Sequence, residues 1–240
     1  MSDHATAAIL TIGSELVAGD VENTNASWLA RRLEQLGIVV RLVVSVPDEI
    51  EPIGEQIRRE ATRVDVLIVT GGLGGTPDDV TREAIAAAFG VEQREHPEVA
   101  ERLRTRFKSS PDYAARWALL PEGARPLEIP RGGAPGFVLE NVYVLPGLPG
   151  EMKPMFESIE DELRRERPIA SWRRTFSARE SEIAPVLAEA ARGYPDVRVG
   201  SYPSFTPDGP LVEVVAKSSQ PELLHEASAW LEAELVTLTN

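Results

Sequence analysis

VDVLIVTGGLGGTPDDVTREAI, residues Val64 to Ile85, is the stretch that predicts both the fold and the position of a ligand site. Its β-branched apolar run from Val66 to Val69 is typical of a central parallel strand covered on both faces. Glycines follow at once and let the backbone take conformations closed to other residues: Gly71, Gly72, Gly74 and Gly75. Successive N–H groups in such a loop, beside a helix N-terminus, form a concavity for an anion. The stretch therefore predicts a phosphate site at the end of a buried strand.

Two neighbouring carboxylates, Asp78 and Asp79, follow the glycine loop. They would repel a bare phosphate, so we expect a divalent cation between the carboxylate and phosphate oxygens, and magnesium suits oxygen ligands. In the alternative interpretation, one aspartate is only the N-cap of a helix from Val80 to Phe89 and the glycines only make a turn. That interpretation leaves the second carboxylate unexplained.

Strand and helix patterns alternate along the first part of the chain, which predicts an α/β domain, residues 1–169, with a doubly wound, mostly parallel sheet. Besides the central strand, we expect strands at Ala7–Ile12, Ile38–Val46, Arg125–Ile129, Gly136–Leu139 and Val142–Leu145, the last two joined by a hairpin turn at Glu140-Asn141. We expect helices at Asn23–Leu36, Asp48–Arg63, Thr81–Phe89, Pro97–Phe107 and Pro149–Arg167.

The pattern changes near Ala170 to that of a small α+β domain, residues 170–240. Its expected β-α-β-β-α order comprises a strand at Trp172–Ser177, a helix at Glu180–Ala191, strands at Val197–Tyr202 and Leu211–Ala216, and a helix at Pro221–Leu235. We interpret this module as a dimerisation or partner-docking element and expect a homo-oligomer.

The composition excludes several classes of protein. With 38 acidic against 25 basic residues and a net charge of -13, nucleic acid is not an expected partner. The chain has no cysteine, which excludes disulfides and zinc–thiolate sites. No apolar run approaches the ~20 residues that span a bilayer, and the N-terminus lacks the basic region of a signal peptide. We therefore expect a cytoplasmic protein that does not enter a membrane.

Polar residues are expected to converge at one edge of the sheet, because ligands of doubly wound sheets bind at the carboxyl ends of the strands. Glu15, Asp48 and Asp79 each follow a predicted strand. Asp48 has an alternative interpretation as a simple helix cap. A stiff turn at Pro146–Glu151 follows another strand and forms either a further wall of the crevice or a purely structural turn. No P-loop lysine, dinucleotide fingerprint or serine nucleophile motif is present.

A series of short motifs in order resembles a known family over essentially the whole chain. They are Gly13-Ser14-Glu15-Leu16 with Gly19, Thr24-Asn25, Gly71-Gly72-Leu73-Gly74, Thr76, Asp78-Asp79-Val80-Thr81, Ala134-Pro135-Gly136-Phe137, Leu145-Pro146-Gly147, Glu151-Met152-Lys153-Pro154-Met155-Phe156 and Gly200-Ser201-Tyr202-Pro203. The chain resembles the molybdopterin-binding fold of molybdopterin adenylyltransferases and molybdenumtransferases, and most of all the N-terminal region of the competence/damage-inducible protein CinA. Full CinA proteins carry a further amidase domain, which we do not expect here.

The resemblance implies pyrophosphate-bond chemistry on a nucleotide such as ADP-ribose or on a pterin. It implies that Asp48 and Asp79 hold a divalent metal, Mg or Co, and act in catalysis. It also implies a set of ligand-binding residues: Gly13, Ser14, Glu15, Asn25, Gly71, Gly72, Leu73, Gly74, Gly75, Thr76, Asp78, Thr81, Pro146, Gly147 and Pro149. Two positions depart from the family, because Ser14 stands where many relatives have aspartate and Gly75 where CinA-like proteins usually have proline.

Three functions remain open from the sequence. The first is a metal-dependent nucleotide pyrophosphatase in which the glycine loop holds the phosphate that is not attacked. The second is a non-catalytic carrier or sensor of molybdopterin or a nucleotide. The third is adenylyl transfer in molybdenum cofactor metabolism. In each case the expected partner is a small molecule.

Overall fold

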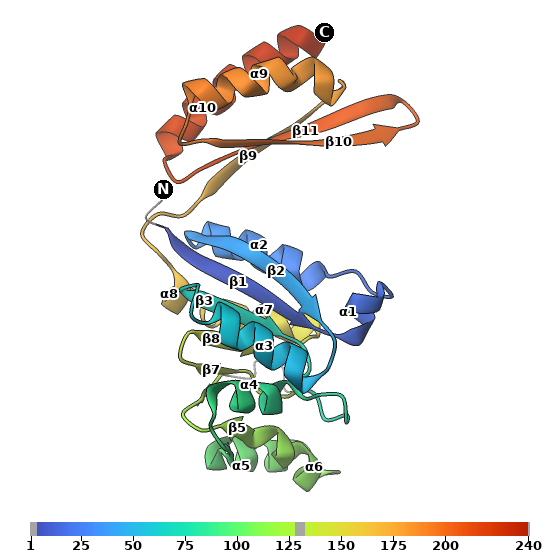
Figure 1. Cartoon of the computed structure of the whole chain (residues 1–240), viewed down its shortest axis with the longest axis vertical. Coiled ribbons are helices and arrows are strands. Elements are labelled where there is room, and N and C mark those ends of the chain that lie inside the picture. The colour runs from blue at the N-terminus through green and yellow to red at the C-terminus, as the bar shows by residue number, and fades with distance from the viewer. Residues whose placement is uncertain (1–3, 128–132, 240) are drawn as a thin grey trace. The chain divides into compact units, whose positions relative to one another are not determined.

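The computed structural model describes residues 4–127 and 133–239, and the chain divides into two compact units (Figure 1). The first unit comprises the residues up to Leu33 together with Ile38–Arg165. The second comprises Glu34–Gly37 and the residues from Glu166 onward. Within the described part of the chain, no helix is both long enough and apolar enough to cross a bilayer. Each unit is described by itself.

A six-stranded sheet forms the centre of the first unit, in the order β2-β1-β3-β8-β7-β6. The strands are β1 (Ala5–Ile12), β2 (Ile38–Val46), β3 (Val66–Thr70), β6 (Arg125–Pro126), β7 (Phe137–Leu139) and β8 (Val142–Leu145). Strands β2, β1, β3 and β8 run parallel, whereas β7 is antiparallel to both β8 and β6. Glu140 has a φ of 52° in the β7–β8 turn. The structure confirms the predicted mostly parallel sheet.

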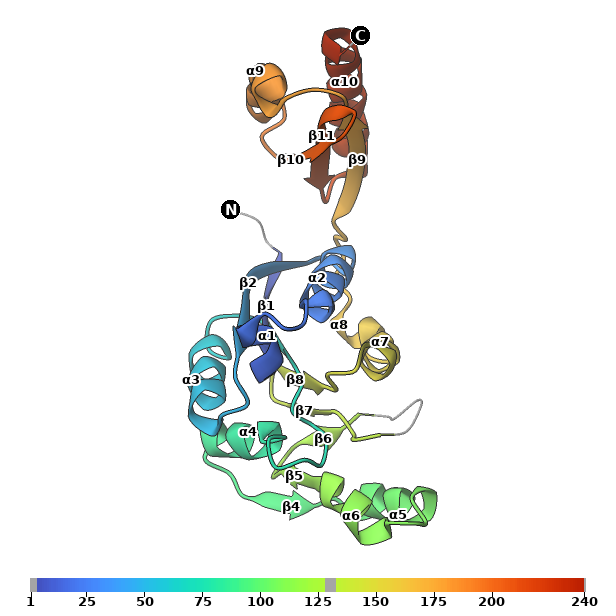
Figure 2. The same cartoon turned by 90° about the vertical axis from the view of Figure 1, so that its right-hand side faces the viewer.

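Helices cover both faces of this sheet (Figure 2). On one side lie α3 (Ile50–Glu60) and α4 (Thr81–Phe89), and on the other lie α2 (Thr24–Gln35), α7 (Pro149–Glu157) and α8 (Glu160–Leu163). A short helix, α1 (Ser14–Ala18), follows β1. Because both faces are covered, β3 is buried over its whole length.

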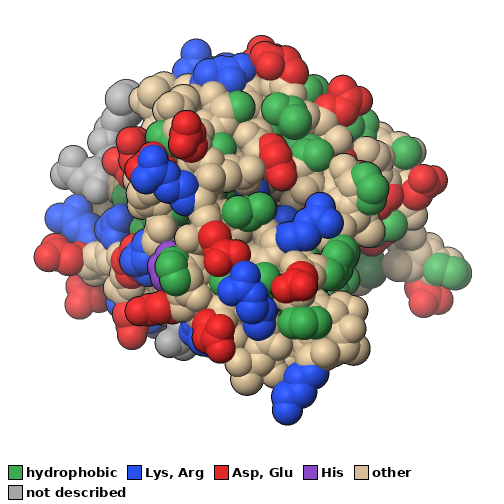
Figure 3. Space-filling view, turned by 90° about the horizontal axis from the view of Figure 1, so that it is seen from below, with side chains coloured by type: hydrophobic (Ala, Val, Ile, Leu, Met, Phe, Trp, Pro, Cys, Tyr) green, Lys and Arg blue, Asp and Glu red, His purple; other side chains and the backbone are tan. Residues whose placement is uncertain are grey.

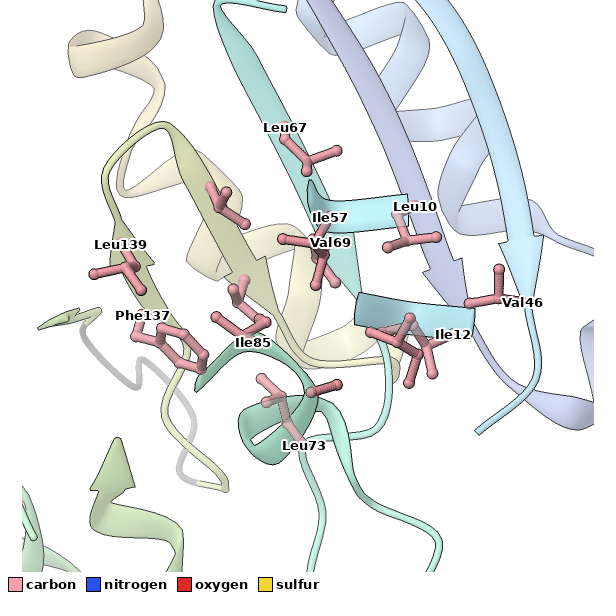
Figure 4. Packing of buried hydrophobic residues seen from close by; sticks show 14 of the residues in the cluster. Leu10, Ile12, Val46, Ile57, Leu67, Val69, Leu73, Ile85, Phe137 and Leu139 are labelled. Carbon is pink, nitrogen blue, oxygen red and sulfur yellow. The ribbon is translucent and has the colours of Figure 1, made fainter. Parts of the chain in front are cut away.

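Apolar side chains from the sheet, α3 and α4 form one continuous core (Figure 4). Leu67 and Val69 of β3 are almost fully buried in it, as are Ile57 of α3 and Ile85 of α4. Leu73, from the glycine loop, belongs to the same core and is 2% exposed. This anchoring fixes the loop to the sheet, because a buried leucine contributes about 1.5–3 kcal/mol through the apolar surface it removes from water.

A smaller layer that the sequence patterns did not predict in full follows α4. It consists of β4 (Gln93–Glu95), α5 (Pro97–Arg106), α6 (Pro111–Ala115), the 3-10 helix η1 (Arg116–Ala118) and β5 (Leu119–Pro121). Only α5 was expected. A small cluster of buried residues that includes Val99, Leu103 and Ala118 holds the layer together. In the space-filling view from the side of this layer, acidic and basic side chains on the surface are interspersed with hydrophobic ones (Figure 3).

Some expected elements differ in the structure. The helix expected at Asp48–Arg63 is shorter, since α3 spans Ile50–Glu60. The single helix expected at Pro149–Arg167 is wrong, because α7 and α8 are separate helices. The Ser158 hydroxyl donates to the Met155 carbonyl at 2.7 Å, a side-chain bond that competes with the helical pattern where α7 ends. The strand expected at Arg125–Ile129 is shorter, since β6 ends at Pro126, and its last two residues lie outside the described part of the chain.

The second unit has the predicted β-α-β-β-α order. It contains β9 (Ala170–Phe176), α9 (Glu180–Gly193), β10 (Arg198–Thr206), β11 (Gly209–Ser218) and α10 (Pro221–Thr239). The antiparallel sheet has the order β10-β11-β9, and its core lies between β11 and the two helices. On β10, Tyr202 is 57% and Phe205 is 85% exposed.

Candidate functional site

A cavity of about 580 Å³ lies at the carboxyl edge of the parallel strands. Its walls come from the segments that follow β1, β2, β3 and β8 and from the first residues of α2 and α7. This is the position at which doubly wound sheets bind ligands, because the strand order reverses there and opens a crevice. Its volume lies within the ~300–1,000 Å³ typical of small-molecule sites.

Asp48 is held by Ser14 across the ends of β1 and β2. Its Oδ2 accepts hydrogen bonds from the Ser14 N–H at 2.7 Å and from the Ser14 hydroxyl at 3.0 Å. The Asp48 N–H in turn lies 3.2 Å from the Ser14 Oγ. Asp48 does not cap the next helix, because α3 begins at Ile50 and its N-cap, Glu49, forms no side-chain capping bond. The carboxylate is thus positioned by the first residue of α1, which follows β1.

Asp79 holds the glycine loop in shape. Its Oδ1 accepts from the Gly74 N–H, and its Oδ2 from the Thr76 N–H, both at 2.8 Å. The Thr76 hydroxyl also donates to Oδ2. Asp79 is not the N-cap of α4, because that position is Val80 and carries no side-chain capping bond. Both carboxylate oxygens are therefore engaged by the loop.

The turns after β3 and β8 approach each other closely at Gly71. This residue has a φ of 111°, and a Cβ there would collide with the Ile12 carbonyl oxygen, so both conformation and space require glycine. The buried Thr81 hydroxyl donates to the Gly71 carbonyl at 2.9 Å. A Cβ on Gly147 would lie 3.3 Å from the Gly71 Cα. The two turns form one rigid wall of the cavity.

The start of α2 supplies two asparagines with different tasks. Asn23 has a structural role, because its Oδ1 accepts a hydrogen bond from the Ala26 N–H and its Nδ2 donates to the hydroxyls of Thr11 and Ser45. Asn25 donates from Nδ2 to the Gly147 carbonyl at 2.7 Å, but its buried Oδ1 has no partner among the described residues. Asn25 therefore presents an unused acceptor in the wall of the cavity.

Glu22 and Glu151 also line the cavity. Neither was predicted as a ligand-binding residue, although the turn at Pro146–Glu151 was considered as a wall of the crevice. Burial raises the pKa of the Glu151 carboxyl above its ordinary value. The position of Glu151 in the first turn of a helix that follows a strand was the available signal. Asp78 behaves in the opposite way, because the Thr76 hydroxyl lowers the pKa of this exposed carboxyl.

Most of the predicted site residues meet in this cavity. Those that line it are Gly13, Glu15, Asn25, Asp48, Gly71, Gly72, Leu73, Gly74, Asp78, Asp79, Pro146, Gly147 and Pro149. Ser14 contacts the cavity only through Asp48, and Thr81 is fully buried beneath the loop. Gly75 and Thr76 line a second, smaller cavity on the other side of the loop.

The lining of the large cavity is strongly acidic. It includes six carboxylates and, among the described residues, no lysine, arginine or histidine: Glu15, Glu22, Asp48, Asp78, Asp79 and Glu151. Among the described lining residues, positive potential comes from backbone groups. The α2 and α7 N-termini contribute to the walls, and the N–H groups of Gly72 and Leu73 have no acceptor within the described residues. An anionic ligand therefore needs these N–H groups or an accompanying cation.

The carboxylates of the large cavity suit a cation that is already bound to the phosphates of a small-molecule ligand. They do not suit a cation that is held by protein side chains alone. In the described residues, no group of three or more histidine, cysteine, aspartate or glutamate side chains is arranged to hold a metal ion. Asp48 has one oxygen, Oδ1, outside its bonds to Ser14. Both oxygens of Asp79 already accept bonds from the loop. Asp48 thus suits a magnesium ion that is bound through one or two carboxylates and substrate phosphates.

A family model described as "Probable molybdopterin binding domain" matches residues 8–165, and a second, "FAD synthase, middle domain", matches residues 171–238. The chain therefore belongs to the family of probable molybdopterin-binding domains, as the resemblance of its motifs implied. No single activity follows from this membership.

Within this family the chain is similar to CinA. It matches the crystal structure of CinA from Thermoplasma acidophilum with a TM-score of 0.64 and 30% identity, covering 68% of this chain and 99% of that one. It is 42% identical to a CinA-like protein of Frankia casuarinae over 76% of this chain, but spans only 47% of that protein. A protein of Pyrobaculum calidifontis is 38% identical over 97% of this chain and 94% of its own length.

Proposed function

We propose that the chain binds a nucleotide or pterin through its phosphates in the large cavity and cleaves a pyrophosphate bond with the help of a divalent cation. The observation that carries this proposal is a glycine loop whose Gly72 and Leu73 N–H groups have no acceptor among the described residues, at a cavity whose described charged side chains are all carboxylates. Such a lining suits a polyphosphate only when a cation accompanies it. The proposed substrate type is ADP-ribose.

The backbone of the glycine loop would hold the phosphate that is not attacked. Asp79 accepts from the N–H groups of Gly74 and Thr76, and those of Gly72 and Leu73 have no acceptor among the described residues. Donors fixed before the ligand arrives need no reorganisation during the reaction, so they stabilise developing charge efficiently. Asn25 Oδ1 would accept a hydrogen bond from a hydroxyl or amine of the ligand.

Asp48 would hold the cation, with Ser14 keeping the carboxylate in one orientation. When bound, a divalent cation neutralises charge on the leaving phosphate and lowers the pKa of a water molecule. Asp79 was predicted to share both tasks. In the described conformation its contribution is to position the loop, and its direct participation stays a prediction.

The test is to incubate the full chain with ADP-ribose, FAD and ATP, with and without magnesium or cobalt, and to separate the products by chromatography. We expect metal-dependent cleavage of at least one nucleotide, lost in Asp48→Asn. A matched control is Glu49→Gln, which neutralises the exposed carboxylate next in the chain. Cleavage that survives Asp48→Asn, or that needs no metal, would overturn the proposal.

A second candidate is a non-catalytic carrier of molybdopterin or a nucleotide, and adenylyl transfer is the third. The observation that favours a carrier is that both Asp79 oxygens already accept hydrogen bonds from the loop. Asp48 is then the better-placed carboxylate for a metal, and the pair of metal ligands expected for catalysis is incomplete. Tight binding without product from any nucleotide would support the carrier. Transfer of AMP from ATP to a pterin would support the adenylyl-transfer role.

The small unit is proposed to dock a partner or a second copy of the chain. Its β10 strand exposes two aromatic side chains, Tyr202 and Phe205, and exposed apolar residues of this size are often found in interfaces. Light scattering on the full chain and on Phe205→Ser measures the oligomeric state. A monomer at all concentrations would contradict the predicted homo-oligomer.

A further inference from the structure

The second cavity, of about 220 Å³, lies between the glycine loop and the segment formed by α6 and η1. It shares three lining residues with the large cavity: Gly74, Asp79 and Trp117. A ligand whose phosphates bind at the loop therefore has a neighbouring space into which another part of it can extend. The volume is below the ~300–1,000 Å³ of sites for whole small molecules, so this space suits a single ring system.

Aromatic side chains form the wall of the small cavity opposite the loop. Trp117 is fixed from behind by Phe107, with ring centroids 5.3 Å apart and an interplanar angle of 87°. Tyr113 packs against Trp117 at 6.0 Å, and its side chain remains 43% exposed. The Arg116 guanidinium carbon lies 5.9 Å from the Tyr113 ring centroid. The wall thus presents an aromatic ring beside a planar cation.

Two polar groups of this wall are unused. The Trp117 Nε1 is buried and has no hydrogen-bond acceptor among the described residues. Tryptophan N–H groups usually find a partner when buried, so an unpaired one indicates a missing acceptor. The Arg116 guanidinium forms no ion pair or hydrogen bond with a described residue. Arg82, on the same cavity, instead donates to the carbonyls of Leu73 and Gly74.

Gly75 is the point at which the glycine loop contacts the aromatic wall. A Cβ at this position would collide with the Tyr113 hydroxyl and lie 2.9 Å from Trp117 Nε1. Glycine therefore lets the loop and the aromatic wall approach each other without a side chain between them. This gives a physical reason for a glycine, rather than a proline ring, at residue 75 of this chain.

We propose that the small cavity binds the planar nitrogen heterocycle of the ligand whose phosphates lie at the glycine loop. The ring stacks beside Tyr113 and Arg116, and one of its in-plane nitrogen or oxygen atoms accepts the hydrogen bond from Trp117 Nε1. Base–aromatic stacking is tolerant of ring identity, so purine and pterin rings share the chemistry that this wall recognises. The inference rests on the proposed nucleotide or pterin ligand and adds the part of the site that recognises the ring of that ligand.

The test is calorimetric binding to the full chain of adenosine, neopterin, ADP-ribose and inorganic pyrophosphate. We expect Tyr113→Ala and Trp117→Phe each to weaken ADP-ribose and at least one of the two free ring compounds about tenfold, and to leave pyrophosphate unchanged. Trp117→Phe retains an aromatic ring against Phe107 and removes the N–H. The control is Leu238→Ala, which removes an exposed apolar side chain of the other unit.

Unchanged binding of the ring compounds and ADP-ribose in both variants, or no binding of either ring by the wild type, would overturn the inference. Equal weakening of pyrophosphate would also overturn it, because the change would then act through the loop. If Tyr113→Ala does not fold, as judged by circular dichroism, Arg116→Gln takes its place. Cleavage is measured separately: ring binding without cleavage overturns only the proposed hydrolysis, whereas cleavage with unchanged ring binding overturns only this inference.

Discussion

Ser14 and Asp48 form a closed pair in which the serine hydroxyl donates to the carboxylate and lies 3.2 Å from the aspartate N–H. The pair joins the carboxyl ends of β1 and β2, which lie 34 residues apart in the sequence. An aspartate at residue 14 would place two carboxylates in contact and raise the pKa of one of them. The serine therefore leaves Asp48 as a single, oriented carboxylate.

Ser14→Ala is expected to lower the free energy of unfolding by about 0.5–1.5 kcal/mol, because it removes the hydroxyl from the Asp48 bonds and keeps the N–H bond. Urea unfolding measures the change. The control is Ser27→Ala, an exposed serine in α2. An equal or larger loss in Ser27→Ala would show that the pair does not stabilise the fold.

Asp79→Ala is expected to destabilise the first unit by about 1–3 kcal/mol, since two loop N–H groups and the Thr76 hydroxyl lose their acceptor. Hydrogen exchange at Gly74 and Thr76 should accelerate in the same variant. Asp161→Ala, whose carboxylate is 99% exposed, serves as the control. Unchanged exchange at these two amides would contradict the role of Asp79 as the anchor of the loop.

Gly71→Ala and Gly75→Ala are expected to differ in severity. At Gly71 the obstacle is the Ile12 backbone carbonyl and φ is 111°, so we expect a loss of several kcal/mol, on the order of 3. At Gly75 the obstacle is the end of the Tyr113 side chain, so the loss should be smaller and Tyr113→Ala should relieve it. Thermal unfolding of the single and double variants provides the measurement.

Glu151→Gln is expected to be neutral or slightly stabilising at pH 7. Burial raises the folded-state pKa of this carboxyl, so ionisation costs stability as the pH rises from the unfolded-state pKa through the raised one. The glutamine variant avoids that cost, which we put at roughly 0.5 kcal/mol because the group is partly exposed and screened. The difference from the wild type should vanish near pH 4. The prediction is contradicted if the stability of Glu151→Gln relative to the wild type is lower at pH 7 than at pH 4.

The sequence alone determined the layers of the fold and the edge of the sheet at which the site lies. Alternating strand and helix patterns specify a doubly wound sheet, and such a sheet brings Glu15, Asp48 and the glycine loop to one edge. These inferences depend on local periodicity and on the geometry of parallel strands. They therefore need no knowledge of individual side-chain contacts.

Only the tertiary structure decided what each polar side chain does at that edge. Asp79 accepts hydrogen bonds from the loop N–H groups and does not cap the helix that follows it. Asp48 is hydrogen-bonded to Ser14 and does not cap α3. The aromatic wall of Trp117 lies against Gly75 although the two are distant in the sequence. Such contacts depend on chain packing between separate elements, and sequence periodicity carries no information about them.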